Sequence, residues 1–65
     1  MLKVNGKELN YVPGTTISGL LEQLNYPVTR VAVERNGEIV PRKMLSLTLV
    51  EDHDVLEVVS FVGGG

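Results

Sequence analysis

The residues with the most distinctive chemistry stand at the end of the chain, where three glycines follow one another as Gly63, Gly64 and Gly65. Glycine loses more conformational freedom than any other residue when it is ordered, so such a terminus adds no stability to a fold. Without Cβ atoms, the segment can extend through a narrow channel of a partner protein. The terminal carboxylate, with a reference pKa of about 3.5, is ionised at neutral pH and could attack the α-phosphate of ATP. The alternative interpretation is a linker remnant.

Other reactive side chains are scarce in the sequence. The chain has no cysteine, which excludes a thiolate nucleophile, a disulfide and a cysteine-based metal site. His53 lies between acidic residues in a short turn, where neighbouring side chains seldom converge on one ion. We expect a left-handed backbone at His53 rather than a metal site. The serines, Ser18, Ser46 and Ser60, have no plausible base nearby for a hydrolase triad, so no catalytic residue is expected.

The composition excludes several further classes of function. With 65 residues, of which 43% are hydrophobic, the chain can form one small core but cannot enclose a substrate cavity. The formal net charge of −2 argues against nucleic acid as a partner. No apolar run is long enough for a transmembrane helix, and the polar start at 1–6 is unlike a signal peptide. We therefore expect a cytoplasmic protein that binds neither nucleic acid nor membrane.

Two hairpins are predicted, each around an asparagine followed by a glycine. This pair tolerates the positive φ angles of a type I′ turn, and apolar and polar residues alternate on both sides of it. Met1–Val4 and Lys7–Val12 flank the first turn, Asn5-Gly6, and Val31–Arg35 and Glu38–Val40 flank the second, Asn36-Gly37. A final strand is predicted in the apolar run Val55–Val62.

A single helix is predicted between the two hairpins. Four apolar residues recur there at helical spacing, namely Ile17, Leu20, Leu21 and Leu24. Thr16 or Thr15 can serve as N-cap, and Asn25 followed by Pro27 ends the helix. Gly19 costs roughly 1 kcal/mol relative to alanine inside a helix. It is either a tolerated flaw or, in the interpretation that we prefer, a position that lets the helix lie close to a sheet. This order of elements predicts an α+β fold, with one main helix packed on one face of a mixed sheet. The domain is expected to span 1–62, with 63–65 as a tail.

The final strand is predicted to have one exposed apolar face. Glu57 is its only charge, and a carboxylate is very rarely buried unpaired in so small a core, so Glu57 must face water. Because side chains alternate along a strand, Val55, Val59 and Phe61 share the face of Glu57. A single short helix cannot cover both faces of a sheet, so these three residues are predicted to form a partner-docking patch. The alternative is that strand curl or neighbouring loops cover them.

Charge is also segregated along the sequence. Residues 28–43 carry a net charge of +2, whereas residues 44–65 carry −4. An acidic segment beside an apolar strand and a free tail would steer the domain toward a basic partner groove. A merely solvated surface explains the same charges equally well.

Two segments of the sequence resemble a known family. They are Val31–Arg42, with the asparagine-glycine turn followed by Glu-Ile-Val-Pro-Arg, and Asp54–Gly65, with the glycine terminus. Both are similar to the ThiS family, the bacterial sulfur carriers of thiamine biosynthesis, which have a ubiquitin-like β-grasp fold. The sequence departs from the family pattern in two places. His53 replaces the usual glycine of an Asp-Gly-Asp turn, and Gly63 is an additional glycine before the final pair.

The resemblance implies a protein cosubstrate rather than an enzyme. An adenylating enzyme similar to those that activate ubiquitin would use ATP and magnesium to adenylate the carboxylate of Gly65, while Gly63 and Gly64 lie in its channel. Sulfur from a cysteine desulfurase system, typically carried as a persulfide, would then replace AMP and give a thiocarboxylate. Thiazole synthase would accept this sulfur. The carrier itself would bind no cofactor.

Three other functions fit the same sequence features. A small subunit of molybdopterin synthase is a similar sulfur carrier for another pathway. A ubiquitin-related protein modifier would join its terminal glycine to a lysine of a target. A non-catalytic β-grasp binding module would need no free glycine end.

Overall fold

The computed structural model describes residues 1–61. They form five short strands, one α-helix and two 3₁₀ turns, joined by loops. The elements in chain order are β1 (Leu2–Val4), β2 (Lys7–Leu9), α1 (Ile17–Gln23), η1 (Val28–Arg30), β3 (Val31–Arg35), β4 (Glu38–Val40), η2 (Arg42–Met44) and β5 (Val55–Ser60). Val62 and the predicted tail, Gly63, Gly64 and Gly65, lie outside the described residues.

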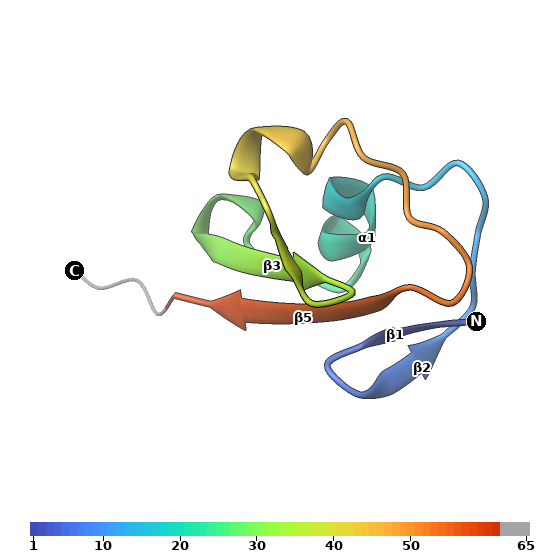
Figure 1. The fold of residues 1–65 in the computed structure, drawn as a ribbon. Coiled ribbons are helices and arrows are strands. Elements are labelled where there is room, and N and C mark those ends of the chain that lie inside the picture. The colour runs from blue at the N-terminus through green and yellow to red at the C-terminus, as the bar shows by residue number, and fades with distance from the viewer. Residues whose placement is uncertain (62–65) are drawn as a thin grey trace.

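The strands form one mixed sheet in the order β2-β1-β5-β3-β4 (Figure 1). Strand β5 lies at the centre, parallel to β1 and antiparallel to β3. Its pairing with β3 extends over five residue pairs, from Val31 opposite Ser60 to Arg35 opposite Leu56. The pairing with β1 covers only two residue pairs. The predicted α+β fold with a mixed sheet is confirmed.

Both predicted hairpin turns are present. Asn5 and Gly6 have φ angles of 52° and 81°, and Asn36 and Gly37 have 52° and 89°, so all four have the left-handed backbone that a type I′ turn requires. The second hairpin has the predicted bounds. The first is shorter than predicted, because β2 ends at Leu9 rather than at Val12.

Helix α1 is closed at both ends as the sequence predicts. The hydroxyl of Thr16 accepts a hydrogen bond from the Gly19 N–H at 3.0 Å, which makes Thr16 the N-cap. Asn25 has a φ of 66°, and Tyr26 N–H donates to the Leu21 carbonyl at 2.9 Å, the pattern of a Schellman motif.

The prediction for Gly19 was wrong in its physical reason. A Cβ atom at this position would lie 3.1 Å from the Thr16 hydroxyl oxygen and 3.9 Å from the Thr15 methyl carbon. No strand atom is among these neighbours. The missing side chain therefore leaves room for the N-cap and not for a close approach to the sheet.

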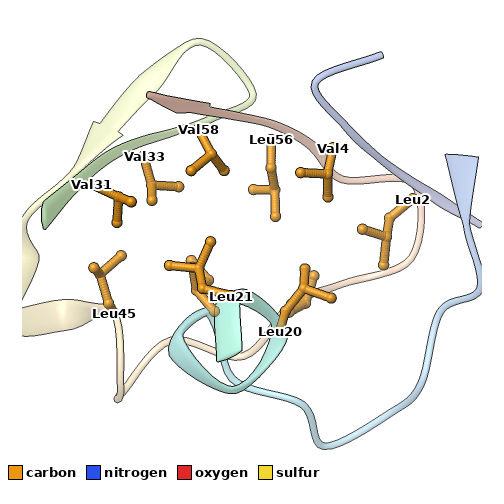
Figure 2. Close-up of a cluster of buried hydrophobic side chains, with 11 residues drawn as sticks. Leu2, Val4, Leu20, Leu21, Val31, Val33, Leu45, Leu56 and Val58 are labelled. Atoms are coloured by element: carbon orange, nitrogen blue, oxygen red, sulfur yellow. The ribbon is translucent and has the colours of Figure 1, made fainter. Parts of the chain in front are cut away.

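The hydrophobic core lies between helix α1 and one face of the sheet. Side chains of the strands point toward Leu20, Leu21 and Leu45 (Figure 2). The buried set comprises Leu2, Val4, Ile17, Leu20, Leu21, Val31, Val33, Leu45, Val50, Leu56 and Val58. The opposite face of the sheet, called here the outer face, contributes none of these residues. Within the described chain, one face of the sheet builds the core and the other remains available for contacts.

Candidate functional site

The outer face of β5 is apolar and exposed, as predicted. Val55, Val59 and Phe61 have 43%, 59% and 53% of their surface accessible to solvent. On the same strand, Leu56 and Val58 are buried against the helix side. The alternation confirms the predicted division of β5 and shows that neither strand curl nor a loop from residues 1–61 covers the patch. Its role in docking a partner is a prediction.

One apolar member of the outer face was missed from the sequence. Ile39 is 65% exposed and lies opposite Glu34 in the β3–β4 pair, whereas Val40 lies opposite the buried Val33. Because Glu34 is in turn opposite Glu57, Ile39 belongs to the same face as the β5 patch. The alternation within Glu38–Val40 carried this signal, but the face of Ile39 could be assigned only with the register of the sheet.

Two carboxylates interrupt the apolar residues of the outer face. Glu57 lies between Val55 and Val59 on β5, and Glu34 of β3 lies directly opposite it. Both are exposed, so the prediction that Glu57 faces water is confirmed. Like charges directly opposite on neighbouring strands destabilise a sheet by a few tenths of a kcal/mol to about 1 kcal/mol. The pair, called here the acidic pair, is therefore a small cost that the fold carries on its outer face.

The beginning of β5 is fixed by a buried carboxylate, Asp54, of which only 4% is exposed. Its oxygens accept hydrogen bonds from Arg35 Nε at 2.9 Å, Asn36 Nδ2 at 3.0 Å and the Glu51 N–H at 2.8 Å. Burial acts to raise the pKa of Asp54, but these three donors outweigh it and hold the pKa below its ordinary value. Asp54 therefore stays ionised and ties the second hairpin to the start of β5.

Both turn asparagines also hold β5 through their side chains. Asn36 Oδ1 accepts from the Val55 N–H at 2.9 Å. On the other side of the strand, Asn5 Oδ1 accepts from the Val58 N–H at 2.7 Å, and Asn5 Nδ2 donates to the Val58 carbonyl at 3.1 Å. The Asn5 amide thus continues the β1–β5 pairing after β1 has ended.

Phe61, the last described residue and the one that follows β5, is anchored as well. The Phe61 N–H donates to the Arg30 carbonyl at 2.7 Å. Strand β5 is consequently held by hydrogen bonds from its first residue to Phe61. A segment that follows Phe61 starts from a fixed position on the sheet.

His53 has the left-handed backbone that we expected, with a φ of 71°. Its side chain is 86% exposed. Within residues 1–61, no group of three or more His, Cys, Asp or Glu side chains is arranged to hold a metal ion. In the same range, no helix has the length and apolarity needed to cross a membrane.

The fold defines a small ubiquitin-like α+β domain, one face of whose sheet is exposed in residues 1–61. Residues 2–65 match the ThiS family, and the chain belongs to this family. The resemblance seen in the two sequence segments is confirmed. The predicted ubiquitin-like β-grasp fold is confirmed by the solved structures that the chain resembles.

Two solved structures of a thiamine biosynthesis protein from Geobacter metallireducens resemble this chain. The crystal structure of this protein, ThiS, has a TM-score of 0.74 and 38% identity, and the match covers 98% of this chain and 97% of that one. The solution structure has a TM-score of 0.77 and 36% identity, with 98% and 86% covered.

Sequence relatives are of two lengths. The sulfur carrier protein ThiS of Bacillus subtilis is 41% identical over 66 residues, which cover 100% of both chains. A thiazole synthase of Paramagnetospirillum magneticum is 45% identical over 64 residues, which cover 98% of this chain and 20% of the relative. The chain therefore spans about a fifth of the length of the thiazole synthase that it matches.

Proposed function

We propose that this chain is the sulfur carrier of thiamine biosynthesis, and that its reactive group is the carboxylate of Gly65. The observation that supports the proposal most directly is the match to the ThiS family through residue 65, which includes all three terminal glycines. The B. subtilis relative matched over its whole length is named as a sulfur carrier protein. The carrier is a cosubstrate and takes its catalysis from other proteins.

The chemistry requires two displacements, one at the α-phosphate of ATP and one at the acyl carbon of Gly65, followed by a reduction. A carboxylate oxygen of Gly65 attacks the α-phosphate of ATP and displaces pyrophosphate, which gives an acyl-adenylate. A persulfide from a cysteine desulfurase system then attacks the acyl carbon and displaces AMP. A thiol reduces the resulting S–S bond and releases the C-terminal thiocarboxylate. The adenylating enzyme supplies ATP and Mg²⁺, whose positive charge balances the phosphates, and the carrier binds no cofactor of its own.

The described residues support this role by what they hold in place. Hydrogen bonds fix β5 at Val55 and Val58 and fix Phe61 directly after it, so the terminus starts from a defined point relative to the outer face. In the proposal, Val55, Val59 and Phe61 dock on the adenylating enzyme, and Gly63 and Gly64 pass through its narrow channel. A rigid docking face lowers the entropy that is lost when the tail is positioned.

Thiazole synthase is the proposed acceptor of the sulfur. Proteins named thiazole synthase contain a stretch that is 45% or 41% identical to almost this whole chain. This relationship and the thiamine biosynthesis proteins among the solved relatives favour the thiamine pathway over the molybdopterin pathway. We propose the cytoplasm as the site of action, because the cysteine-free chain needs no oxidising compartment.

The decisive experiment is intact-mass spectrometry after incubation with the adenylating enzyme, ATP, Mg²⁺ and a persulfide donor. We expect a mass gain that corresponds to the replacement of one oxygen by sulfur, located at Gly65 by fragmentation. A variant that lacks Gly65 is the matched control, and we expect it to keep its circular dichroism spectrum and its melting temperature without gaining mass. An unchanged mass of the full chain, under conditions in which the B. subtilis carrier gains sulfur, would refute the proposal.

A further inference from the structure

The acidic pair of the outer face takes part in no ion pair of residues 1–61. The ion pairs of residues 1–61 involve Arg35, His53 and the amino terminus, and none includes Glu34 or Glu57. Lys3 is the nearest cation by register, since it lies beside Val55 on the neighbouring strand β1. It forms no ion pair within 4.0 Å in the described chain. The two carboxylates therefore lie opposite each other without an ion-pair partner in residues 1–61.

The residues around the acidic pair are apolar, and they indicate why the lack of an ion-pair partner matters for binding. Val55 and Val59 flank Glu57 along β5, Ala32 lies opposite Val59, and Ile39 lies next to Glu34 on β4. A partner that covers the apolar residues must also cover the two carboxylates between them. Removing a carboxylate from water without a counter-charge is strongly unfavourable. An entirely apolar partner surface would consequently bind this face poorly.

Arginine is the side chain that fits the acidic pair best. Its planar guanidinium has five N–H donors and can bind two carboxylates at once, and it is less strongly hydrated than the ammonium of lysine. Arginine is also enriched among the residues that contribute most to protein interfaces. Its flat faces would pack against the apolar side chains beside the pair, such as those of Val59 and Ile39.

We propose that the outer face of the sheet receives an arginine of the protein partner, with the guanidinium between Glu34 and Glu57 and its stem among Ile39, Val55 and Val59. The inference rests on the proposed function, in which the partner is the adenylating enzyme or thiazole synthase. Charge complementarity at this point selects the partner, while the apolar residues around it exclude water. The small cost of the acidic pair in the free chain is offset when the arginine binds.

The test compares two double variants with the same change in net charge. Glu34→Gln/Glu57→Gln removes the acidic pair, and Glu22→Gln/Glu38→Gln removes two exposed carboxylates elsewhere. Glu22 is on helix α1, and Glu38 alternates with Ile39 and so lies on the other side of β4. Binding of each variant to each enzyme is measured by calorimetry at several salt concentrations, together with the melting temperature.

We expect the acidic-pair variant to bind at least one of the two enzymes about tenfold more weakly or worse. Its affinity should depend less on salt than that of the wild type, because fewer charges meet at the interface. Its melting temperature should be equal or higher, since the repulsion is gone. The control variant should bind as the wild type does. A residue needed only for the fold would lower the melting temperature instead.

The identity of the cation is tested by chemical modification of the enzyme. We expect the wild-type carrier, but not the acidic-pair variant, to protect one enzyme arginine from phenylglyoxal, as mapped by peptide mass spectrometry. Protection of a lysine from acetylation in place of an arginine would overturn the assignment of arginine.

The failure of this inference can be told apart from a failure of the proposed function. If the acidic-pair variant binds both enzymes as tightly as the wild type, and the wild type still gains sulfur, only the inference is overturned. If the wild type neither binds nor gains sulfur, both are overturned.

Discussion

The two faces of strand β5 differ sharply in their exposure to solvent. Leu56 and Val58 are 0% and 6% exposed, whereas their neighbours Val55 and Val59 are 43% and 59% exposed. The same residue type, valine, therefore stabilises the fold on one face and gives it an apolar surface on the other. Burial of apolar surface is the main stabilising contribution in a domain of this size, and the exposed valines add little of it, which agrees with the proposal that they contact a partner.

The largest expected effect is on the inner face. Replacing Leu56 by alanine should destabilise the domain by about 2–5 kcal/mol, because it leaves a cavity between β5 and helix α1. Urea denaturation followed by circular dichroism measures the change. The matched control on the outer face is Val55→Ala, for which we expect a much smaller loss. Equal losses for the two variants would contradict the division of the strand into two faces.

A negative charge introduced on the outer face should weaken the binding of a partner rather than lower the stability of the fold. We expect Val59→Asp and Phe61→Asp each to lower the affinity for the adenylating enzyme by about 2 kcal/mol or more, since both residues lie in the predicted docking patch. The melting temperature should change little, because both side chains are more than half exposed. Leu47→Asp is the control, since Leu47 is 71% exposed and lies outside β5. A large drop in melting temperature for Val59→Asp would show instead that its face belongs to the core.

The hydrogen bonds of Asp54 fix the start of β5, and their contribution to the stability of the fold should depend on pH. Because the pKa of Asp54 is lower in the folded chain than in the unfolded one, its carboxylate stabilises the fold above the unfolded pKa of about 3.9. This contribution is lost as the pH falls through the lower, folded pKa. We expect Asp54→Asn to be less stable than the wild type by about 1–3 kcal/mol at neutral pH.

Denaturation from neutral pH to about pH 3 measures this effect, and the difference between wild type and Asp54→Asn should shrink at the acidic end. Glu22→Gln serves as the control, since Glu22 is an exposed helix residue whose side chain makes no hydrogen bond or ion pair among those found in residues 1–61. A gap between wild type and Asp54→Asn that stays constant with pH would show that the carboxylate acts by its shape and not by its charge.

The smallest change in the free energy of unfolding is expected for a substitution in helix α1, at Gly19. Gly19→Ala should gain roughly 1 kcal/mol of helix propensity and lose a similar amount through crowding of the Thr16 hydroxyl, 3.1 Å from the added Cβ. The free energy of unfolding should therefore change by less than about 1 kcal/mol. In the Thr16→Ala background the crowding is removed, so Gly19→Ala should stabilise. A loss of several kcal/mol in both backgrounds would instead support the interpretation preferred from the sequence, in which Gly19 lies close to the sheet.

The local features of this fold could be predicted from the sequence, and its long-range pairs could not. The turns at Asn5 and Asn36, the caps of α1 and the alternation along β5 depend on residues close together in the chain. The pairing of Glu34 with Glu57 and the place of Ile39 depend on register between strands that are distant in sequence. The anchoring of Val58 by Asn5 was invisible for the same reason. Gly19 was misjudged because its closest neighbour is a side chain of its own helix cap.

The two asparagine-glycine turns are sites at which the molecule can change chemically as it ages. An asparagine followed by glycine is prone to deamidation, which replaces the amide nitrogen by a carboxylate oxygen and is one reason that asparagine counts as thermolabile. At Asn5 the nitrogen lost is the donor to the Val58 carbonyl, and at Asn36 it is the donor to Asp54. Deamidation of Asn36 would place a second negative charge 3.0 Å from Asp54 Oδ1. An aged carrier would then hold β5, and with it the point from which its terminus departs, less firmly than a newly made one.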